Sequence, residues 1–254
     1  MIRNHNELLE ILMLRRSLAV TAASGAHVFP GGVLDEVDSD VLRRGLFTGL
    51  DEERAAQRLS LEAGALTFYC AAVRELFEEA GLLLVLDPQG RTLHLGAHQL
   101  SAWRAELLSG SLTWPDLLER EDMRLALGEL EYLAHWVTPV GRSRRFDTRF
   151  FVALAPPGQD ALADDSEIVE HVWTSAAAAL ERFETGEWSM LVPTVRTLIS
   201  LSTHGNVEDV VRAAATSSVP RIQPREIERD GRTFVVVPGD SGYSDAGEAD
   251  PTPR

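Results

Sequence analysis

The sequence predicts an α/β protein, because segments of strand character alternate with segments of helix character along it. Short apolar runs typical of buried strands lie at 8–14, 82–86, 132–137 and 150–154. The segment at 71–82 instead repeats its apolar residues at helical spacing. The 254 residues are 44% hydrophobic, which is enough to bury one domain with embellishments, or one domain plus a small appendage.

The N-terminal elements are a strand and a glycine turn. The apolar run 8–14 ends at Arg15-Arg16-Ser17, and residues 1–4 leave room for only a shortened partner strand before it. A loop then leads to Val28-Phe29-Pro30-Gly31-Gly32. Its glycines allow positive φ and a close approach of main-chain groups to phosphate or metal. A plain tight turn is the alternative interpretation.

The next predicted elements are two helices. Asp51 is an N-cap for a helix over 52–59, which would either lean over a pocket or decorate the surface. In the helix at 71–82, the buried stripe consists of Val73, Leu76, Phe77 and Ala80. The opposite face carries Glu75, Glu78 and Glu79. Lysines would usually accompany so many carboxylates on a solvated face, and Arg74 is the one nearby cation. A hard divalent cation such as Mg²⁺ takes oxygen ligands, so a solvated face and a metal site both fit the spacing.

The C-terminal half predicts further helices, strands and a hairpin. Its expected elements are helices over 98–130 with a break at Trp114-Pro115, strands at 132–137, 150–154 and 169–173, helices from Ser175 to about 183, from Pro193 to about 202 and over 207–215, and a hairpin over 227–237 that turns at Asp230-Gly231. On the strand 132–137, His135 is interpreted as a packed wall residue rather than a ligand. Glycine, serine, proline and acids dominate residues 239–254, which predicts a disordered tail.

The letters of the acidic helix resemble a known motif. Residues 74–82, Arg-Glu-Leu-Phe-Glu-Glu-Ala-Gly-Leu, resemble the second half of the Nudix box, G-x5-E-x7-R-E-U-x-E-E-x-G-U with U apolar. Gly32 opens the first half, and Asp38 stands where the family usually has Glu. Far more than seven residues separate Asp38 from Arg74, so the box carries an insertion, as in the subgroup of peroxisomal coenzyme A diphosphatases and their bacterial relatives.

The resemblance implies a fold and a division of the chain. The implied fold is an α/β/α sandwich with a mixed sheet, helical insertions and a short C-terminal appendage. The expected division is a Nudix domain over 1–202 with insertions at about 39–67 and 98–130, a helix and hairpin appendage over 203–238, and the tail over 239–254.

The resemblance also implies a chemistry, the divalent-metal-dependent hydrolysis of a diphosphate bond in a nucleoside diphosphate-linked small molecule. Bridging cations would neutralise the phosphate oxygens and activate a water. The implied metal ligands, for Mg²⁺ or Mn²⁺, are Glu75, Glu78 and Glu79. The implied catalytic residues are Glu75, Arg74, which would orient the carboxylates, and Glu167, which would act as base or second-metal ligand. Asp164 and Asp165 are alternatives to Glu167, and a surface acidic loop would look similar.

The substrate expectation comes from a pattern upstream of the box, L-L-T-x-R-[SA]-x3-R-x3-G-x3-F-P-G-G. Residues 12–17, Gly25 and 29–32 keep its register, but Leu14 replaces threonine and Thr21 replaces the second arginine. Coenzyme A or acyl-CoA, cleaved to 3′,5′-ADP and (acyl) 4′-phosphopantetheine, is the leading expectation. A nucleotide sugar or dinucleotide diphosphatase and a non-catalytic nucleotide-sensing domain are the alternatives. The expected substrate-binding residues are Arg16, Gly31, Gly32, Arg144 and Arg145. The last two belong to a cluster of four arginines with Arg142 and Arg149, of which one or two are expected to bind phosphate; pairing with surface acids is the alternative role.

Composition excludes other partners. A net charge of −15 argues against nucleic acid, which favours a basic face. Cys70 is the single cysteine, so no intramolecular disulfide can form and a reducing compartment is expected. No apolar run approaches the length of a membrane span or a signal peptide core. We therefore expect a cytoplasmic enzyme, and the sequence leaves open whether it forms a homodimer.

Overall fold

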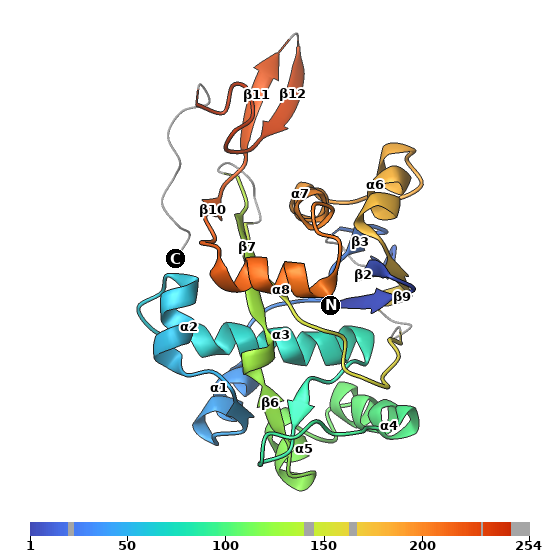
Figure 1. Ribbon diagram of the computed structural model, residues 1–254, viewed down its shortest axis with the longest axis vertical. Helices are drawn as coiled ribbons and strands as arrows, with labels where there is room; N and C mark the ends of the chain where they lie inside the picture. Colours follow the sequence, from blue (N-terminus) through green and yellow to red (C-terminus); the bar gives the residue numbers. More distant parts are fainter. Residues whose placement is uncertain (20–22, 140–144, 163–166, 230, 245–254) are drawn as a thin grey trace.

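The computed structural model describes residues 1–19, 23–139, 145–162, 167–229 and 231–244 (Figure 1). The strands are β1 (Ile2–His5), β2 (Leu8–Arg16), β3 (His27–Val28), β4 (Phe47–Thr48), β5 (Val85–Leu86), β6 (Arg124–Ala126), β7 (Glu131–Val137), β8 (Asp147–Val152), β9 (Ile168–Thr174), β10 (Arg221–Ile222), β11 (Arg225–Arg229) and β12 (Arg232–Val236). The helices are α1 (Glu36–Arg43), α2 (Glu52–Leu59), α3 (Ala65–Ala80), α4 (Ala97–Leu108), α5 (Trp114–Arg120), α6 (Ala176–Glu184), α7 (Val192–Leu201) and α8 (Val207–Thr216), with a 3₁₀ turn at Leu127–Glu129.

Two sheets form the centre of the fold. In the first, antiparallel β9 covers one edge of β2, and antiparallel β1 and β3 share the other edge. In the second, β7 lies between antiparallel β8 and parallel β10. The sheets meet where the Ile2 N–H donates to the Ala153 carbonyl at 3.0 Å and the Ala155 N–H donates to the Ile2 carbonyl at 2.8 Å. The central strands therefore form a mixed arrangement joined at β1.

The side chains of β2 show the layers. Successive residues of a strand point to opposite faces of its sheet. Leu12 and Leu14 are buried in a cluster with α3, whereas Ile11 and Met13 are buried in a second cluster with residues of α6, α7 and α8. The sheet thus lies between α3 and the other three helices, which confirms the expected α/β/α sandwich (Figure 1).

The strand expected at 82–86 is shorter than predicted, because only Val85 and Leu86 pair with β6. The Leu83 N–H donates to Gln159 Oε1 at 2.8 Å, and the Leu83 carbonyl accepts from Gln159 Nε2 at 3.1 Å. A side-chain amide therefore takes the place of a strand partner, which the local pattern could not reveal. The region 98–130, which was expected to be helical, also differs near its end. Residues 124–126 form β6, which pairs with β4 on one side and with β5 on the other.

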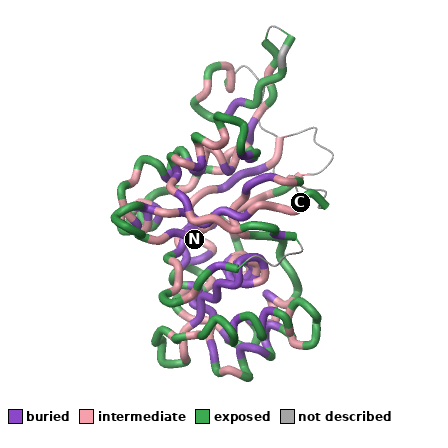
Figure 2. Tube along the Cα trace, turned by 90° about the vertical axis from the view of Figure 1, so that its right-hand side faces the viewer, coloured by how far each residue is buried: buried purple, intermediate pink, exposed green. Residues whose placement is uncertain are grey.

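The C-terminal elements reach back into the core. Residues of α8 are buried in the second cluster, and β10 extends the sheet of β7, whereas the β11–β12 hairpin projects from the molecule and is largely exposed (Figure 2). The hairpin pairs Arg229 with Arg232, which agrees with the predicted place of the turn, although Asp230 lies outside the described residues. Residues 239–244 make contacts, because Asp240 pairs with Arg196 at 2.6 Å and Tyr243 lies against Arg225. The rest of the predicted tail, 245–254, lies outside the described residues.

Two expectations from composition concern the single cysteine and the lack of a membrane-spanning segment. Cys70 is a free cysteine and fully buried, as expected of a packing residue. Among the helices that the structure describes, none combines the length and the apolar character needed to cross a membrane.

Candidate active site

The acidic helix α3 is held at both ends by side chains from the two insertions. At its N-terminus, the Glu52 carboxylate accepts hydrogen bonds from the N–H groups of Ala65 and Leu66 at 2.8 and 3.1 Å. At its C-terminus, the Arg104 guanidinium donates through Nε and Nη2 to the Glu78 carbonyl at 2.9 and 2.6 Å. An anion at the N-terminus and a cation at the C-terminus complement the helix dipole. Glu52 of the first insertion and Arg104 of the second therefore cap the helix, and no residue of 39–67 lines the cavity of about 540 Å³ beside Glu75.

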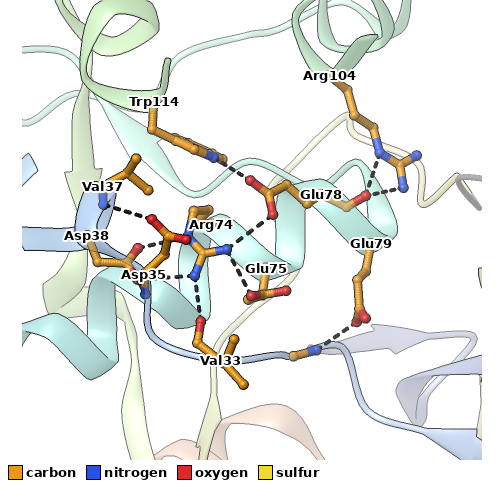
Figure 3. Close-up of polar contacts among 11 residues, drawn as sticks. Val33, Asp35, Val37, Asp38, Arg74, Glu75, Glu78, Glu79, Arg104 and Trp114 are labelled. Carbon is orange, nitrogen blue, oxygen red and sulfur yellow. Dashed lines mark hydrogen bonds and ion pairs between the residues drawn. The ribbon is translucent and has the colours of Figure 1, made fainter. Parts of the chain in front are cut away.

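Arg74 is the centre of the polar network on α3 (Figure 3). Its guanidinium forms a two-pronged pair with Asp38, Nε to Oδ1 at 2.9 Å and Nη2 to Oδ2 at 3.1 Å, and also donates to the Val33 carbonyl at 2.7 Å. The Arg74 side chain is 8% exposed and that of Asp38 is 2% exposed. The shorter carboxylate at position 38 thus reaches its partner across the insertion, because α1 carries it directly against α3.

Glu75 and Glu79 lie against the Gly31-Gly32 turn. The Gly31 N–H donates to Glu79 Oε2 at 2.8 Å, and Arg74 Nη1 donates to Glu75 Oε1 at 2.8 Å. Gly31 has a φ of 153°, and a Cβ on Gly32 would collide with the Glu75 carboxylate. The glycine pair is therefore required so that the main chain can pass directly beside the carboxylates.

Glu78 is engaged differently from the other two glutamates. Its Oε1 accepts from Trp114 Nε1 at 2.7 Å, and its Oε2 accepts from Arg74 Nη1 at 3.1 Å. Figure 3 shows the Glu78 carboxylate directed toward Trp114, while Glu75 and Glu79 point toward the chain that leads to Val33. Arg74 Nη1 therefore joins Glu75 and Glu78, Trp114 also ties Glu78 to the second insertion, and Glu79 is held separately by the Gly31 N–H.

Arg16 and Glu167 complete the polar wall opposite α3. Arg16, at the end of β2, lies 3.6 Å from Glu79 Oε1 through Nη1 and 3.3 Å from Glu167 Oε2 through Nη2. The Ser17 N–H donates to the Glu167 carbonyl at 2.7 Å, which places Glu167 where β9 begins beside β2. Arg16 thus bridges the helix carboxylate and the predicted base, while Asp164 and Asp165 lie outside the described residues.

Burial and crowding change the acidity of the helix carboxylates. Burial raises the pKa of Glu79 to about 7, and the nearby charges of Glu75 and Glu167 add to this, although the Gly31 hydrogen bond opposes it. Burial likewise raises the pKa of Glu75, against the effect of Arg74. Both carboxyl groups therefore hold their protons to a higher pH than an exposed glutamate does.

A cavity of about 540 Å³ adjoins Glu75. Its polar end includes Arg16, Gly31, Gly32 and Glu75. Most of the remaining lining is apolar and comes from α3, from β8 and from the segment after β3. The volume is that of a small-molecule site.

Only some of the arginines expected to bind phosphate lie among the described residues that line the cavity. Arg142 and Arg144 lie outside the described residues. Of the arginines that the structure describes, Arg16 and Arg149 line the cavity, and Arg145 does not. Arg149 donates to Asp147 Oδ1 at 2.9 Å and lies over the Phe68 ring. His135 also bonds Asp147, at 2.6 Å, which agrees with its interpretation as a packed wall residue.

Sequence reasoning missed several residues that hold the site together. Arg149 was predicted only as a member of the four-arginine cluster, and the alternation along β8, which gives it the orientation of Asp147 and Phe151, could have singled it out. Glu52, Arg104 and Trp114 carried none, since their partners on α3 are distant in sequence and the contacts depend on how the insertions pack.

The residues present fit a divalent cation in their donor chemistry. In the part of the chain that the structure describes, no three His, Cys, Asp or Glu side chains converge as a ready metal site. Glu75 and Glu79 nevertheless offer carboxylate oxygens beside the Gly31-Gly32 main chain, and such oxygens are the ligands that a hard divalent cation takes.

Comparisons with known proteins agree with this geometry. The family described as the NUDT19 Nudix domain matches residues 3–201. An acyl-coenzyme A diphosphatase NUDT19 from Gallus gallus is 28% identical, with 92% of this chain and 72% of that protein covered. The Homo sapiens protein of the same name is 27% identical at the same coverage. The crystal structure of a NUDIX hydrolase from Alicyclobacillus acidocaldarius aligns with a TM-score of 0.71 and 27% identity, over 86% of this chain and 94% of that one.

Fold, site and comparisons together define a hydrolase of the Nudix class. Within that class, the chain belongs to the family described as the NUDT19 Nudix domain.

The Arg74–Asp38 pair is expected to dominate local stability. Asp38→Ala would leave a buried guanidinium without its main partner, so it should lower the free energy of unfolding by about 3–5 kcal/mol in urea denaturation. Asp40→Ala, on the same helix, removes partly exposed pairs with Arg43 and Arg44 and should cost at most about 1 kcal/mol. Equal losses for the two variants would contradict the central position of Arg74.

Glu79 should make the metal-free protein less stable as the pH rises. Its pKa of about 7 lies above the ordinary value of 4.5, so between these values the unfolded chain loses the proton first and stability falls. Glu79→Gln lacks this titration and should exceed wild type by about 1–3 kcal/mol above pH 7 but not at pH 4.5. Urea denaturation in EDTA measures the difference, with exposed Glu62→Gln as control. A gain that does not vary with pH would refute this explanation.

Proposed function

We propose that the chain hydrolyses the diphosphate of coenzyme A or an acyl-CoA, with Mg²⁺ or Mn²⁺, to 3′,5′-ADP and (acyl) 4′-phosphopantetheine. The observation that carries the proposal is the cavity of about 540 Å³, which is mostly apolar and opens at one end onto Glu75, Arg16 and the Gly31-Gly32 turn. Coenzyme A has the matching division, a charged diphosphate continued by a long and weakly polar arm. The printed names of the relatives from Gallus gallus and Homo sapiens support the same substrate class.

The cation-binding part of the proposal rests on Glu75 and Glu79. Their carboxylates lie beside the glycine turn, and Arg74 holds Glu75 in place. Glu78 would need to release the Trp114 N–H before it could contribute an oxygen. When bound, the divalent cation would neutralise diphosphate oxygens and acidify a water.

Arg16 and Glu167 carry the other two roles. The Arg16 guanidinium offers a planar donor fork suited to phosphate oxygens, and its present partners Glu79 and Glu167 are carboxylates that a diphosphate can replace. Glu167 is the general base, which takes the proton of the water that attacks phosphorus as the P–O–P bond breaks. Its 60% exposed side chain allows it to move toward that water.

A panel of substrates tests the proposed function directly. Purified protein with Mg²⁺ or Mn²⁺ should cleave CoA or acyl-CoA, detected as 3′,5′-ADP by chromatography, faster than ADP-ribose, NADH or nucleotide sugars. Glu79→Gln should lower kcat by at least about a hundredfold, because it removes a carboxylate that would hold the cation, whereas Glu78→Gln should lose less. Equal rates on nucleotide sugars, or full activity in EDTA, would refute the proposal.

The position of Arg16 predicts a binding defect. A charged hydrogen bond to phosphate is worth about 1.5–3 kcal/mol, so Arg16→Ala should raise KM for CoA roughly ten- to a hundredfold. Arg15→Ala is the matched control, since Arg15 pairs with Glu170 on the surface and does not line the cavity described here. Initial rates over a range of CoA concentrations separate KM from kcat. An unchanged KM in Arg16→Ala would remove this residue from the phosphate site.

A further inference from the structure

Among the strands that the structure describes, β7 pairs with one edge of β8, and none pairs with the other edge over most of its length. Along one side it pairs with β7 from Asp147 to Val152. On the other side, the first neighbour is β1, which reaches it only at Ala153 through the Ile2 N–H. Before that point the two sheets diverge, and the 540 Å³ cavity, lined by both Ile2 and Ala153, lies between them.

Hydrogen bonds at the two ends of β8 show which of its main-chain N–H and C=O groups point toward β7 and which point away. The Phe146 carbonyl accepts from Thr138 on the β7 side, and the Ala153 carbonyl accepts from Ile2 on the opposite side. Because N–H and C=O groups alternate between the two sides of a strand, Arg149 and Phe151 direct theirs away from β7, as Ala153 does. Phe150 directs its own groups toward Ala134 of β7.

These outward groups have no hydrogen-bond partner among the residues that the structure describes. Among the described residues, no hydrogen bond reaches the main-chain N–H or C=O of Arg149 or Phe151 from the side away from β7. Both residues are half-buried and line the cavity. Main-chain groups that are shielded from bulk water require another partner, either water or a ligand.

We infer that this free edge of β8 binds the amide-bearing arm of the substrate through main-chain hydrogen bonds, as an added strand would. The inference rests on the proposed function for the identity of that arm. The 4′-phosphopantetheine arm contains two secondary amides separated by two methylenes, so its donors and acceptors repeat almost as in a peptide. Pairing along a sheet edge provides the hydrogen bonds, and the apolar wall receives the carbon skeleton.

The arrangement explains how one cavity accepts both parts of the substrate. Glu75 and the Gly31-Gly32 turn line the same cavity as Arg149 and Phe151, so a diphosphate at the polar end continues directly into the arm along β8. A nucleotide sugar has no amide chain at the corresponding place, and would leave the edge unpaired. Discrimination between these substrate classes therefore comes from the main chain, in addition to any side chain.

The adjacent phenylalanines allow a test that leaves every side chain unchanged. Replacing the Phe151 residue by its α-hydroxy analogue, L-3-phenyllactic acid, turns its amide into an ester and removes the N–H that faces the cavity. The same change at Phe150 removes an N–H that pairs with β7. Each ester also weakens the preceding carbonyl as an acceptor, but losing a donor is the larger effect. The Phe151 ester should therefore mainly lose affinity for the arm, and the Phe150 ester should mainly lose stability.

The measurements are affinities for the two expected products and the melting temperature. The Phe151 ester should bind 4′-phosphopantetheine about three- to tenfold more weakly, as for one lost neutral hydrogen bond, and should bind 3′,5′-ADP as wild type does. The Phe150 ester should lose more thermal stability and less affinity than the Phe151 ester. Equal affinity of wild type and Phe151 ester for 4′-phosphopantetheine, or equal weakening of both products, would overturn the inference.

Wild-type activity separates this inference from the proposed function. If wild type cleaves CoA while the Phe151 ester keeps full affinity for 4′-phosphopantetheine, the edge-pairing inference alone fails. If wild type does not cleave CoA, the proposed function fails. If wild type binds 4′-phosphopantetheine no more tightly than inorganic phosphate, the β8 edge has no role in binding the arm and the inference fails as well.

Discussion

A buried guanidinium that must be neutralised is the constraint on which the site depends. Arg74 is almost fully enclosed, and its five donors are shared among Asp38, Glu75, Glu78 and the Val33 carbonyl. A buried charge that loses its partner destabilises a fold by several kcal/mol, so these groups must come together as the protein folds. Through them, the chain after the glycine turn is fixed to α3, and Trp114 joins the second insertion to Glu78. The network thus positions the carboxylates before any ligand binds.

The insertion within the Nudix box separates its halves in sequence but not in space. The chain leaves the glycine turn, forms α1, and presents Asp38 to Arg74 from a capped first turn. It then forms α2, whose Glu52 caps the next helix, so the inserted residues help to orient the element that follows them. Arg104 acts on the other end of α3 in the same way. Both insertions therefore stabilise the helix that carries the glutamates. Loss of either cap would destabilise the helix that positions these side chains.

Local rules predicted those parts of the molecule whose interactions are local. The two faces of the helix at 71–82, the N-cap at Asp51 and the hairpin turn at 230–231 depend on residues within a few positions of each other. The predictions failed where a distant group intervened. Gln159 shortens the strand at 82–86, and Trp114 turns Glu78 away from Glu79. The parallel pairing of β10 with β7 and the free edge of β8 are likewise long-range outcomes, which periodicity in one segment cannot express.

A chain with a net charge of −15 must hold an anionic substrate against its own long-range field. Among the described residues, the arginines that line the cavity are Arg16 and Arg149, and both are already paired with carboxylates. Their positive charge is therefore largely cancelled before a diphosphate arrives. A cation held by Glu75 and Glu79 would reverse the sign of the charge on the helix side, and would release Arg16 from Glu79 toward the phosphate. In the proposed mechanism, the need for a divalent metal thus follows from the charge balance of the site as well as from the activation of water.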